Sequence, residues 1–295
     1  MKTYGFVIAD VFTPTPFGGN QLAVLPDARG LSAKQMQVLA REFNFAESTF
    51  VFPAEQAGAA PRVRIFTPTT EVPFAGHPTV GTAAVLAQRG ELAVTTLELG
   101  IGPIEVAVRT EPQQTFASFT FEREIEGPAV APTRKAAATA LSLSEADVLD
   151  GWFAGVGLPF FCVHLATRAA VDRAVLDHAQ WRANFRDAWA AQLFFFSGDY
   201  APGAQLYARM FAPAFGISED PATGSACAAL VGALAKRTRS ATPVSLIIEQ
   251  GVAMGRPSRI EASAKLVSAN GASIKVGGLT VIVGEGRIVA PRLEG

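Results

Sequence analysis

The sequence predicts an α/β protein made of two similar domains, and three observations support this. Short apolar segments rich in β-branched and aromatic residues, typical of strands, alternate with segments of helical pattern. A strand, a turn and a helix start recur in the same order, about 143 positions apart. The chain has 295 residues, which suits two domains of ordinary size or one large one, and the repeat favours two.

The composition narrows the class of protein. Hydrophobic residues make up 49% of the chain and charged residues 17%, so a large core is available and extensive disorder is not expected. The net charge of -1 gives no excess of positive charge with which to bind nucleic acid or an anionic membrane. The apolar stretches are about strand length, and the N-terminal segment lacks the features of a signal peptide. We therefore expect a soluble, cytoplasmic globular protein with neither a nucleic-acid nor a membrane partner.

The first half of the chain is predicted to hold several strands and one amphipathic helix. The helix is expected at 32–44, with Ser32 and Gln35 placed as a capping box and Asn44 as a left-handed stop. Segment 121–135 is mixed in charge and interrupted by prolines, which indicates a linker. We therefore expect domains at 1–122 and 123–295, with the C-terminal strand able to return to the first. The expected strands of this half are 4–12, 48–52, 62–66, 96–100 and 104–108.

The second half partly repeats this order. Strands are expected at 158–166, 191–198 and 206–213, and a helix of small residues at 223–237. The clearest repeat pairs "FAGHPTVGTAAVL" (74–86) with "EDPATGSACAALV" (219–231). When the prolines are superimposed, His77 lies over Asp220. Upstream, "VRIFTP" (63–68) matches "ARMFAP" (208–213), with Arg64 over Arg209. A strand, a turn and a helix start that match in sequence favour duplication over coincidence.

The repeated turn has the composition of an anion site. Proline suits the first helical position, which would place His77 and Asp220 at or next to two helix N-caps. Gly81 and Gly224 would let another group approach the first turn closely. Exposed N–H groups and the helix dipole favour an anion there, so two facing turns would hold a small carboxylate between two titratable groups. The alternatives are that the aspartate only caps its helix and that the histidine is an ordinary loop residue.

Four blocks of sequence carry a resemblance to a known family. They are "FGGNQLAVLPDARGLSAKQMQVLAREFNFAESTFV" (17–51), "RIFTPTTEVPFAGHPTVGTA" (64–83), "MFAPAFGISEDPATGSACAAL" (210–230) and "IEQGVAMGRPSRIEA" (248–262). Together they resemble the PhzF-like isomerases, a family named for a phenazine biosynthesis enzyme. The similarity extends over nearly the whole chain, although the middle, about 123–190, is not diagnostic.

The resemblance implies a diaminopimelate epimerase-like fold of two pseudo-symmetric domains. In that fold each domain wraps a mixed, largely antiparallel, barrel-like sheet around a central helix, and the active site lies between the domains. The helices after Pro78 and Pro221 would be the central ones, and their small residues fit because such a helix is apolar all round. The family is often dimeric, so a homodimer is expected.

The resemblance also implies proton transfer at carbon on a small carboxylate, with neither a cofactor nor a metal. Glu47, in "FAESTF", matches the catalytic base, while the alternative for a bare glutamate is a solvated loop residue. An ordinary glutamate, with a pKa of about 4.3, is a feeble base for a C–H bond, so the site must raise that pKa and stabilise the enolate-like charge. The same match places His77 and Asp220 with it as catalytic residues. The residues expected to bind the substrate carboxylate are Gly76, Gly224 and Ser225.

The cysteines separate this chain from racemases of the same fold, which use one cysteine per domain as acid and base. Here the two turns carry none, and Cys162 and Cys227 are expected to be buried packing residues. His164 and His178 have no partner pattern and are expected to be structural. Two alternatives remain for function. One is epimerase or lyase chemistry on another small acid with the same glutamate, and the other is a non-catalytic protein of this fold that binds a small ligand.

Overall fold

The computed structural model describes residues 2–54, 59–90, 95–111, 114–239 and 242–292. The chain forms two compact units. The first unit comprises Met1–Thr120 with Gly277–Gly295, and the second comprises Phe121–Val276. Two strands, β8 (Gln114–Glu124) and β15 (Gly271–Val289), each contain residues of both units.

The first unit contains a closed barrel. Around the barrel the strand order is β1-β2-β3-β4-β6-β7-β8-β15, and β15 pairs with β1 to close it. The pairs β2–β3 and β4–β6 are parallel, whereas β1–β2, β3–β4, β6–β7, β7–β8 and β15–β1 are antiparallel. The remaining strands are β1 (Thr3–Val11), β2 (Asn20–Leu25), β3 (Glu47–Phe52), β4 (Arg62–Phe66), β6 (Thr96–Leu99) and β7 (Gly102–Glu111), and the short β5 (Glu71–Val72) pairs with β4.

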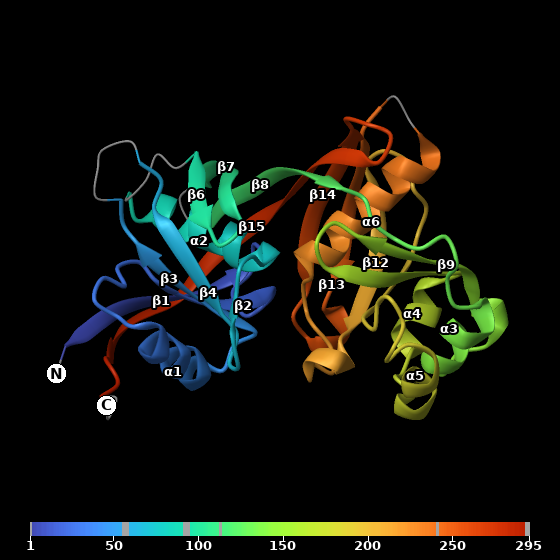
Figure 1. Ribbon diagram of the computed structural model, residues 1–295, viewed down its shortest axis with the longest axis horizontal. Helices are drawn as coiled ribbons and strands as arrows, with labels where there is room; N and C mark the ends of the chain where they lie inside the picture. Colours follow the sequence, from blue (N-terminus) through green and yellow to red (C-terminus); the bar gives the residue numbers. More distant parts are fainter. Residues whose placement is uncertain (1, 55–58, 91–94, 112–113, 240–241, 293–295) are drawn as a thin grey trace. The chain divides into compact units, whose positions relative to one another are not determined.

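A helix lies inside this barrel and another outside it (Figure 1). The inner helix, α2 (Gly76–Gln88), packs against β1, β2, β3 and β7, and every residue from Gly76 to Leu86 is buried. Its small and apolar residues confirm the prediction of a central helix. The outer helix, α1 (Ala33–Phe43), packs on β3 and β4. The capping box of Ser32 with Gln35 and the left-handed Asn44, at φ 53°, are both confirmed.

The second unit repeats the plan of a sheet on a buried helix. Its strand order is β14-β13-β12-β11-β10-β9, with β10–β11 and β12–β13 parallel. The helix α6 (Gly224–Thr238) packs against β9, β10, β13 and β14 and is buried from Ala226 to Ala235. Three shorter helices, α3 (Arg134–Ala140), α4 (Arg168–Arg173) and α5 (His178–Asn184), cover an aromatic cluster that includes Phe161, Phe185 and Phe195. The strands are β9 (Val148–Gly155), β10 (Pro159–Leu165), β11 (Leu193–Ser197), β12 (Ala204–Phe211), β13 (Val244–Gln250) and β14 (Ser258–Leu266).

The structure corrects two local predictions. Residues 121–124 of the expected linker belong to strand β8, because a ladder of backbone hydrogen bonds satisfies the chain there despite its mixed charge. Neither proline occupies the first helical position. Pro78 is the third residue of α2, where its missing N–H is still not needed. Pro221 lies before α6, whose N-cap is Thr223, so Asp220 precedes that cap by three residues.

The parallel strand pairs place the two repeats in the same register. In the first unit Arg62 of β4 lies opposite Glu98 of β6, and in the second Tyr207 of β12 lies opposite Glu249 of β13. Since the sequence repeat matches Arg64 with Arg209, and hence position 62 with 207, the register matches Glu98 with Glu249. The residues that follow therefore match as well, Leu99 with Gln250 and Gly100 with Gly251.

Candidate active site

Glu47 and His77 come together at the end of a strand and the start of a helix in the first unit. Glu47 is the first residue of β3, and His77 is the second residue of α2. Nδ1 of the imidazole lies 3.6 Å from Oε2 of the carboxylate. The imidazole is 6% exposed and the Glu47 side chain 20%, so the histidine is enclosed while the carboxylate still reaches the surface.

A hydrogen bond between two buried threonines fixes the strand relative to the helix. Thr82 of α2 donates to Oγ1 of Thr49 at 2.9 Å, and neither side chain is exposed to solvent. Since alternate residues of a strand share a face, Thr49 lies on the same side of β3 as Glu47. Thr82 lies between one and two turns beyond His77 on the helix. The bond therefore fixes both elements close to the Glu47–His77 contact.

Burial keeps the imidazole of His77 uncharged. It lowers the pKa of His77 from 6.5 to about 3, against the opposing effect of a hydrogen bond with the backbone of Gln21. At neutral pH the contact with Glu47 is therefore one between a carboxylate and a neutral ring, not an ion pair. Within the described part of the chain, Nε2 of His77 is buried without a hydrogen-bond partner.

The N-terminus of α2 supplies backbone donors beside His77. The regular hydrogen bonds of this helix begin with the one that the N–H of Thr79 donates to the carbonyl of Ala75. The N–H groups of Gly76 and His77 precede it, so neither has an acceptor within the helix. Together with the positive end of the helix dipole, they suit a carboxylate.

Asp220 sits in a separate polar cluster in the second unit. Its side chain is nearly buried, and Oδ2 accepts a hydrogen bond of 2.5 Å from the hydroxyl of Thr223. Gln250, at the end of β13, contacts both residues through its side-chain amide. The predicted binding residues Gly224 and Ser225 are the first two residues of α6, which places their N–H groups at that helix N-terminus.

The predicted residues thus form one group in each unit. Glu47, Gly76 and His77 are together in the first, and Asp220, Gly224 and Ser225 are together in the second. Gly81 does not open the turn to a ligand, because a Cβ there would lie 2.6 Å from the buried side chains of Leu22 and Val11. That glycine serves the packing of the helix inside the barrel.

An arginine–glutamate pair supports the turn in both units. In the first unit Arg64 donates from Nε and Nη2 to the two carboxylate oxygens of Glu71. In the second, Arg209 makes the same two bonds with Glu219, the residue before Asp220. Arg209 is buried, and its Nη1 also donates to the carbonyls at the end of α4, those of Val171, Asp172 and Ala174.

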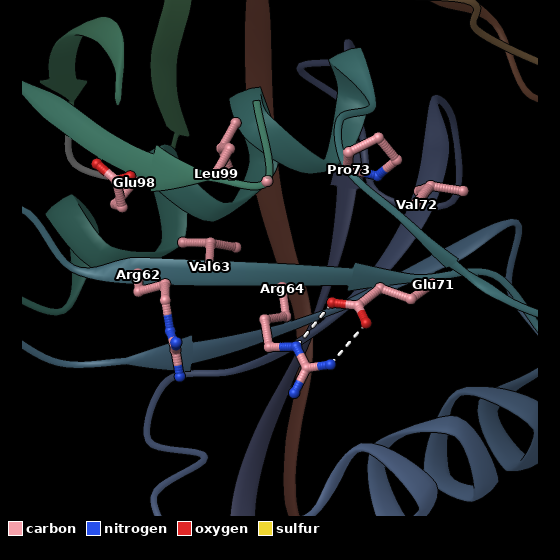
Figure 2. Close-up of a pocket in the computed structure, with 9 residues that line it drawn as sticks. Arg62, Val63, Arg64, Glu71, Val72, Pro73, Glu98 and Leu99 are labelled. Atoms are coloured by element: carbon pink, nitrogen blue, oxygen red, sulfur yellow. Dashed lines mark hydrogen bonds and ion pairs between the residues drawn. The ribbon is translucent and has the colours of Figure 1, made fainter. Parts of the chain in front are cut away.

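The first unit has a surface pocket of about 420 Å³ beside β4 and β6, the strands that match β12 and β13 of the second unit (Figure 2). Arg62 and Arg64 line it from β4, and Glu98 with Leu99 line it from β6. In the second unit, α4 packs against β12, and its Arg168 binds Glu249, the residue that matches Glu98. The pocket does not include Glu47, Gly76 or His77, so it is distinct from the candidate catalytic residues.

Three of the remaining residues singled out in the sequence have structural surroundings, and the fourth, His178, is the first residue of α5. Cys162 and Cys227 are fully buried free thiols, and burial raises the pKa of both. His164 contacts the carbonyl oxygen of Gly198 and the hydroxyl of Tyr200 through its two ring nitrogens. Across the described ranges, no three His, Cys, Asp or Glu side chains are grouped so that they could hold a metal ion, and no helix is long and apolar enough to cross a membrane.

Sequence reasoning missed the polar residues that support the candidate groups. Gln250 and Thr223 lie within longer motifs of the sequence that do not mark them individually, and Asp10 lies within an expected strand. Asp10 is buried and accepts a hydrogen bond of 2.6 Å from the N–H of Phe17, which folds the loop before β2 back onto β1. The strand-by-strand match of the two units, which a sequence repeat alone does not give, is the signal that singles out Gln250.

Comparison with known proteins identifies the family. A family model described as "Phenazine biosynthesis-like protein" matches residues 9–286. An "uncharacterized isomerase" of Mesorhizobium japonicum is 37% identical, with 98% of this chain and 99% of that protein covered. The trans-2,3-dihydro-3-hydroxyanthranilate isomerase of Pseudomonas aeruginosa is 34% identical, with 96% and 98% covered.

Solved structures agree with the predicted fold. A PhzF-family phenazine biosynthesis protein of Bacillus anthracis superimposes with a TM-score of 0.84 at 25% identity, covering 98% of this chain and all of that one. A hydroxyproline epimerase of Agrobacterium vitis, at 13% identity, has a TM-score of 0.62 over 98% and 91% of the two chains and shares the fold alone. The diaminopimelate epimerase-like fold is confirmed, and the chain belongs to the phenazine biosynthesis-like, or PhzF, family.

Proposed function

We propose that this protein, an isomerase of the PhzF family, moves a proton between carbon atoms of a small carboxylic acid without a cofactor. Relatives at 34–35% identity bear the name trans-2,3-dihydro-3-hydroxyanthranilate isomerase, so a compound of this class is the first substrate to test. The observation that carries the proposal is the contact of Glu47 with a buried, neutral His77.

The geometry suits Glu47 as the base. Its carboxylate would take a proton from a substrate carbon, and the C–H electron pair would move into an enolate-like system. The partly exposed carboxylic acid would exchange its proton with solvent and then donate a proton to another carbon. A positive charge beside the Glu47 carboxylate would make that carboxylate a weaker base. The neutral His77 puts no such charge there. A neutral imidazole also carries one N–H and one lone pair, so it can relay a proton.

The helix N-termini would bind the substrate's anionic group. The N–H groups of Gly76 and His77 are suited to a carboxylate, and so are those of Gly224 and Ser225. Donors of this kind also stabilise negative charge that develops in the transition state. Asp220 would accept a hydrogen bond from the substrate's amino or hydroxyl group.

Deuterium uptake tests this proposal. The protein is incubated in D₂O with trans-2,3-dihydro-3-hydroxyanthranilate and a panel of related acids, and label at carbon is followed by NMR. The Glu47→Gln variant should lose uptake by at least a hundredfold, and the control Glu42→Gln, on the exposed face of α1, should retain it. Uptake that survives in Glu47→Gln would show that another residue is the base. Binding without uptake by the natural protein on every acid would favour a ligand-binding function.

A further inference from the structure

The side chain of Gln250 is fully buried and makes three hydrogen bonds to the Asp220 turn. Its Nε2 donates to the backbone carbonyl of Asp220 at 2.8 Å and to Oγ1 of Thr223 at 2.9 Å. Its Oε1 accepts from the N–H of Thr223 at 3.1 Å. If the amide were reversed, its NH₂ group would face the N–H of Thr223, and its oxygen would face the carbonyl oxygen of Asp220. Both contacts would be repulsive, so these partners allow only one orientation of the amide.

This amide determines where the Thr223 hydroxyl points. Oγ1 accepts a hydrogen from Gln250, and so its own hydrogen is directed at the other polar neighbour, Oδ2 of Asp220, 2.5 Å away. A hydroxyl donating to a carboxylate over such a short distance makes a strong, charge-assisted hydrogen bond. The chain Gln250–Thr223–Asp220 therefore holds Oδ2 as an acceptor.

The backbone around the chain is held as well. The N–H of Asp220 donates to the carbonyl of Met210, and the hydroxyl of Ser258 contacts the carbonyl of Pro221. The residue after Gln250 is Gly251, at φ +77°, where a Cβ would lie 2.5 Å from that same carbonyl oxygen. The turn and the end of β13 thus approach more closely than a larger residue would allow.

The first unit shows that this polar chain is not a requirement of the fold. The register matches Gln250 with Leu99. The sequence repeat matches Thr223, the N-cap of α6, with Val80, the fifth residue of α2. Both counterparts are apolar and buried. The unit whose turn carries an imidazole thus has apolar residues at both positions. The unit whose turn carries a carboxylate has an amide and a hydroxyl there, and both are hydrogen-bonded to that turn.

We propose that Gln250 is a positioning residue that acts through Thr223 to hold the Asp220 carboxylate as an oriented acceptor for the reaction. The expected effect on the reaction rests on the proposed function, whereas the hydrogen-bonded arrangement of Gln250, Thr223 and Asp220 does not. Gln250→Glu keeps the shape and removes both donated bonds, and Thr223→Val removes the hydroxyl. Thr223→Ser keeps the hydroxyl, and Gln205→Glu, an exposed residue of β12, is the control.

Steady-state kinetics give the first test. Gln250→Glu and Thr223→Val should each lower kcat at least tenfold, while Thr223→Ser and Gln205→Glu stay within threefold of the natural protein. The double variant should be no slower than Gln250→Glu alone, because both changes act through one hydroxyl. Two outcomes would show that Gln250 is only a structural residue. One is that the losses of kcat multiply in the double variant, and the other is that kcat stays unchanged while the unfolding midpoint falls.

Proton NMR of the free protein gives a test that needs no activity. The Thr223 hydroxyl proton should give a slowly exchanging downfield resonance, absent in Thr223→Val and lost or shifted in Gln250→Glu. If this pattern is found and no acid is turned over, the positioning stands and the proposed function fails. If the resonance is absent, or is unaffected by Gln250→Glu, the positioning is wrong whatever the activity.

Discussion

Nδ1 of His77 lies 3.6 Å from Oε2 of Glu47, yet the two groups do not form an ion pair at neutral pH. The pKa of His77 falls to about 3 because the ring is buried in the first turn of a helix enclosed by a barrel. A positive charge there would cost more in lost hydration than the neighbouring carboxylate returns. This relationship gives the first prediction.

The stability of the protein should fall at acid pH partly because of His77. The pKa in the folded state, about 3, is below the ordinary value of 6.5, so the unfolded chain binds the extra proton first. Stability from this group is present above pH 6.5 and decreases as the pH falls toward 3. Between pH 7.5 and 4.5 the free energy of unfolding should drop by about 3 kcal/mol more in the natural protein than in His77→Asn.

Urea denaturation of both proteins at the two pH values measures this difference. The carboxylates and the other histidines are common to both and cancel in the comparison. Equal pH dependence in the two proteins would mean that His77 is charged, or accessible to water, in the folded state.

The two cysteines should be inert in the folded protein. Both thiols are fully buried, and burial raises the pKa of each, so little reactive thiolate forms at neutral pH. A thiol reagent such as dithionitrobenzoate should modify neither Cys162 nor Cys227 within an hour at pH 8, and both after denaturation in guanidinium. Rapid reaction of either cysteine in the native protein, with loss of activity, would reopen a role for thiol chemistry.

Much of the fold was predictable from sequence because its signals are local. The capping box of Ser32 with Gln35 and the stop at Asn44 are fixed by residues within one helix. The candidate site was less predictable, because its support comes from contacts distant in sequence, such as Gln250 with Thr223. The helix starts were misjudged because proline tolerates several places near a helix start, and the backbone around it decides which.

The two arginine–glutamate pairs should differ in their contribution to stability. Arg209 and Glu219 are 10% and 14% exposed, and the guanidinium also satisfies backbone carbonyls at the end of α4. Arg64 and Glu71 are 25% and 41% exposed. Arg209→Met leaves a buried carboxylate and carbonyls unpaired and should cost about 3–5 kcal/mol, whereas Arg64→Met should cost about 1 kcal/mol or less.

Equilibrium urea unfolding of the two variants beside the natural protein measures these costs. Each substitution keeps a long apolar side chain, so lost packing contributes little to the comparison. Similar losses at both positions would contradict the argument that burial and the extra carbonyl partners separate the two pairs.

Glycines inside the two buried helices should respond in opposite ways to alanine. At Gly81 of α2 a Cβ would lie 2.6 Å from side-chain methyl groups of Leu22 and Val11, both fully buried, so these side chains must shift. Overpacking of this kind costs about 1–3 kcal/mol, which exceeds the gain of up to about 1 kcal/mol from replacing a helical glycine. At Gly232 of α6 the nearest atoms are 3.4 Å away, an ordinary contact, so only the gain remains.

Gly81→Ala should therefore lower the urea midpoint, and Gly232→Ala should leave it unchanged or raise it. The two residues occupy the same kind of element, a helix packed in a sheet, so helix propensity is matched and the close contacts make the difference. A stabilising Gly81→Ala would mean that Leu22 and Val11 can move aside. The barrel around α2 would then be loosely packed, and the Thr82–Thr49 hydrogen bond would be what fixes the approach of His77 to Glu47.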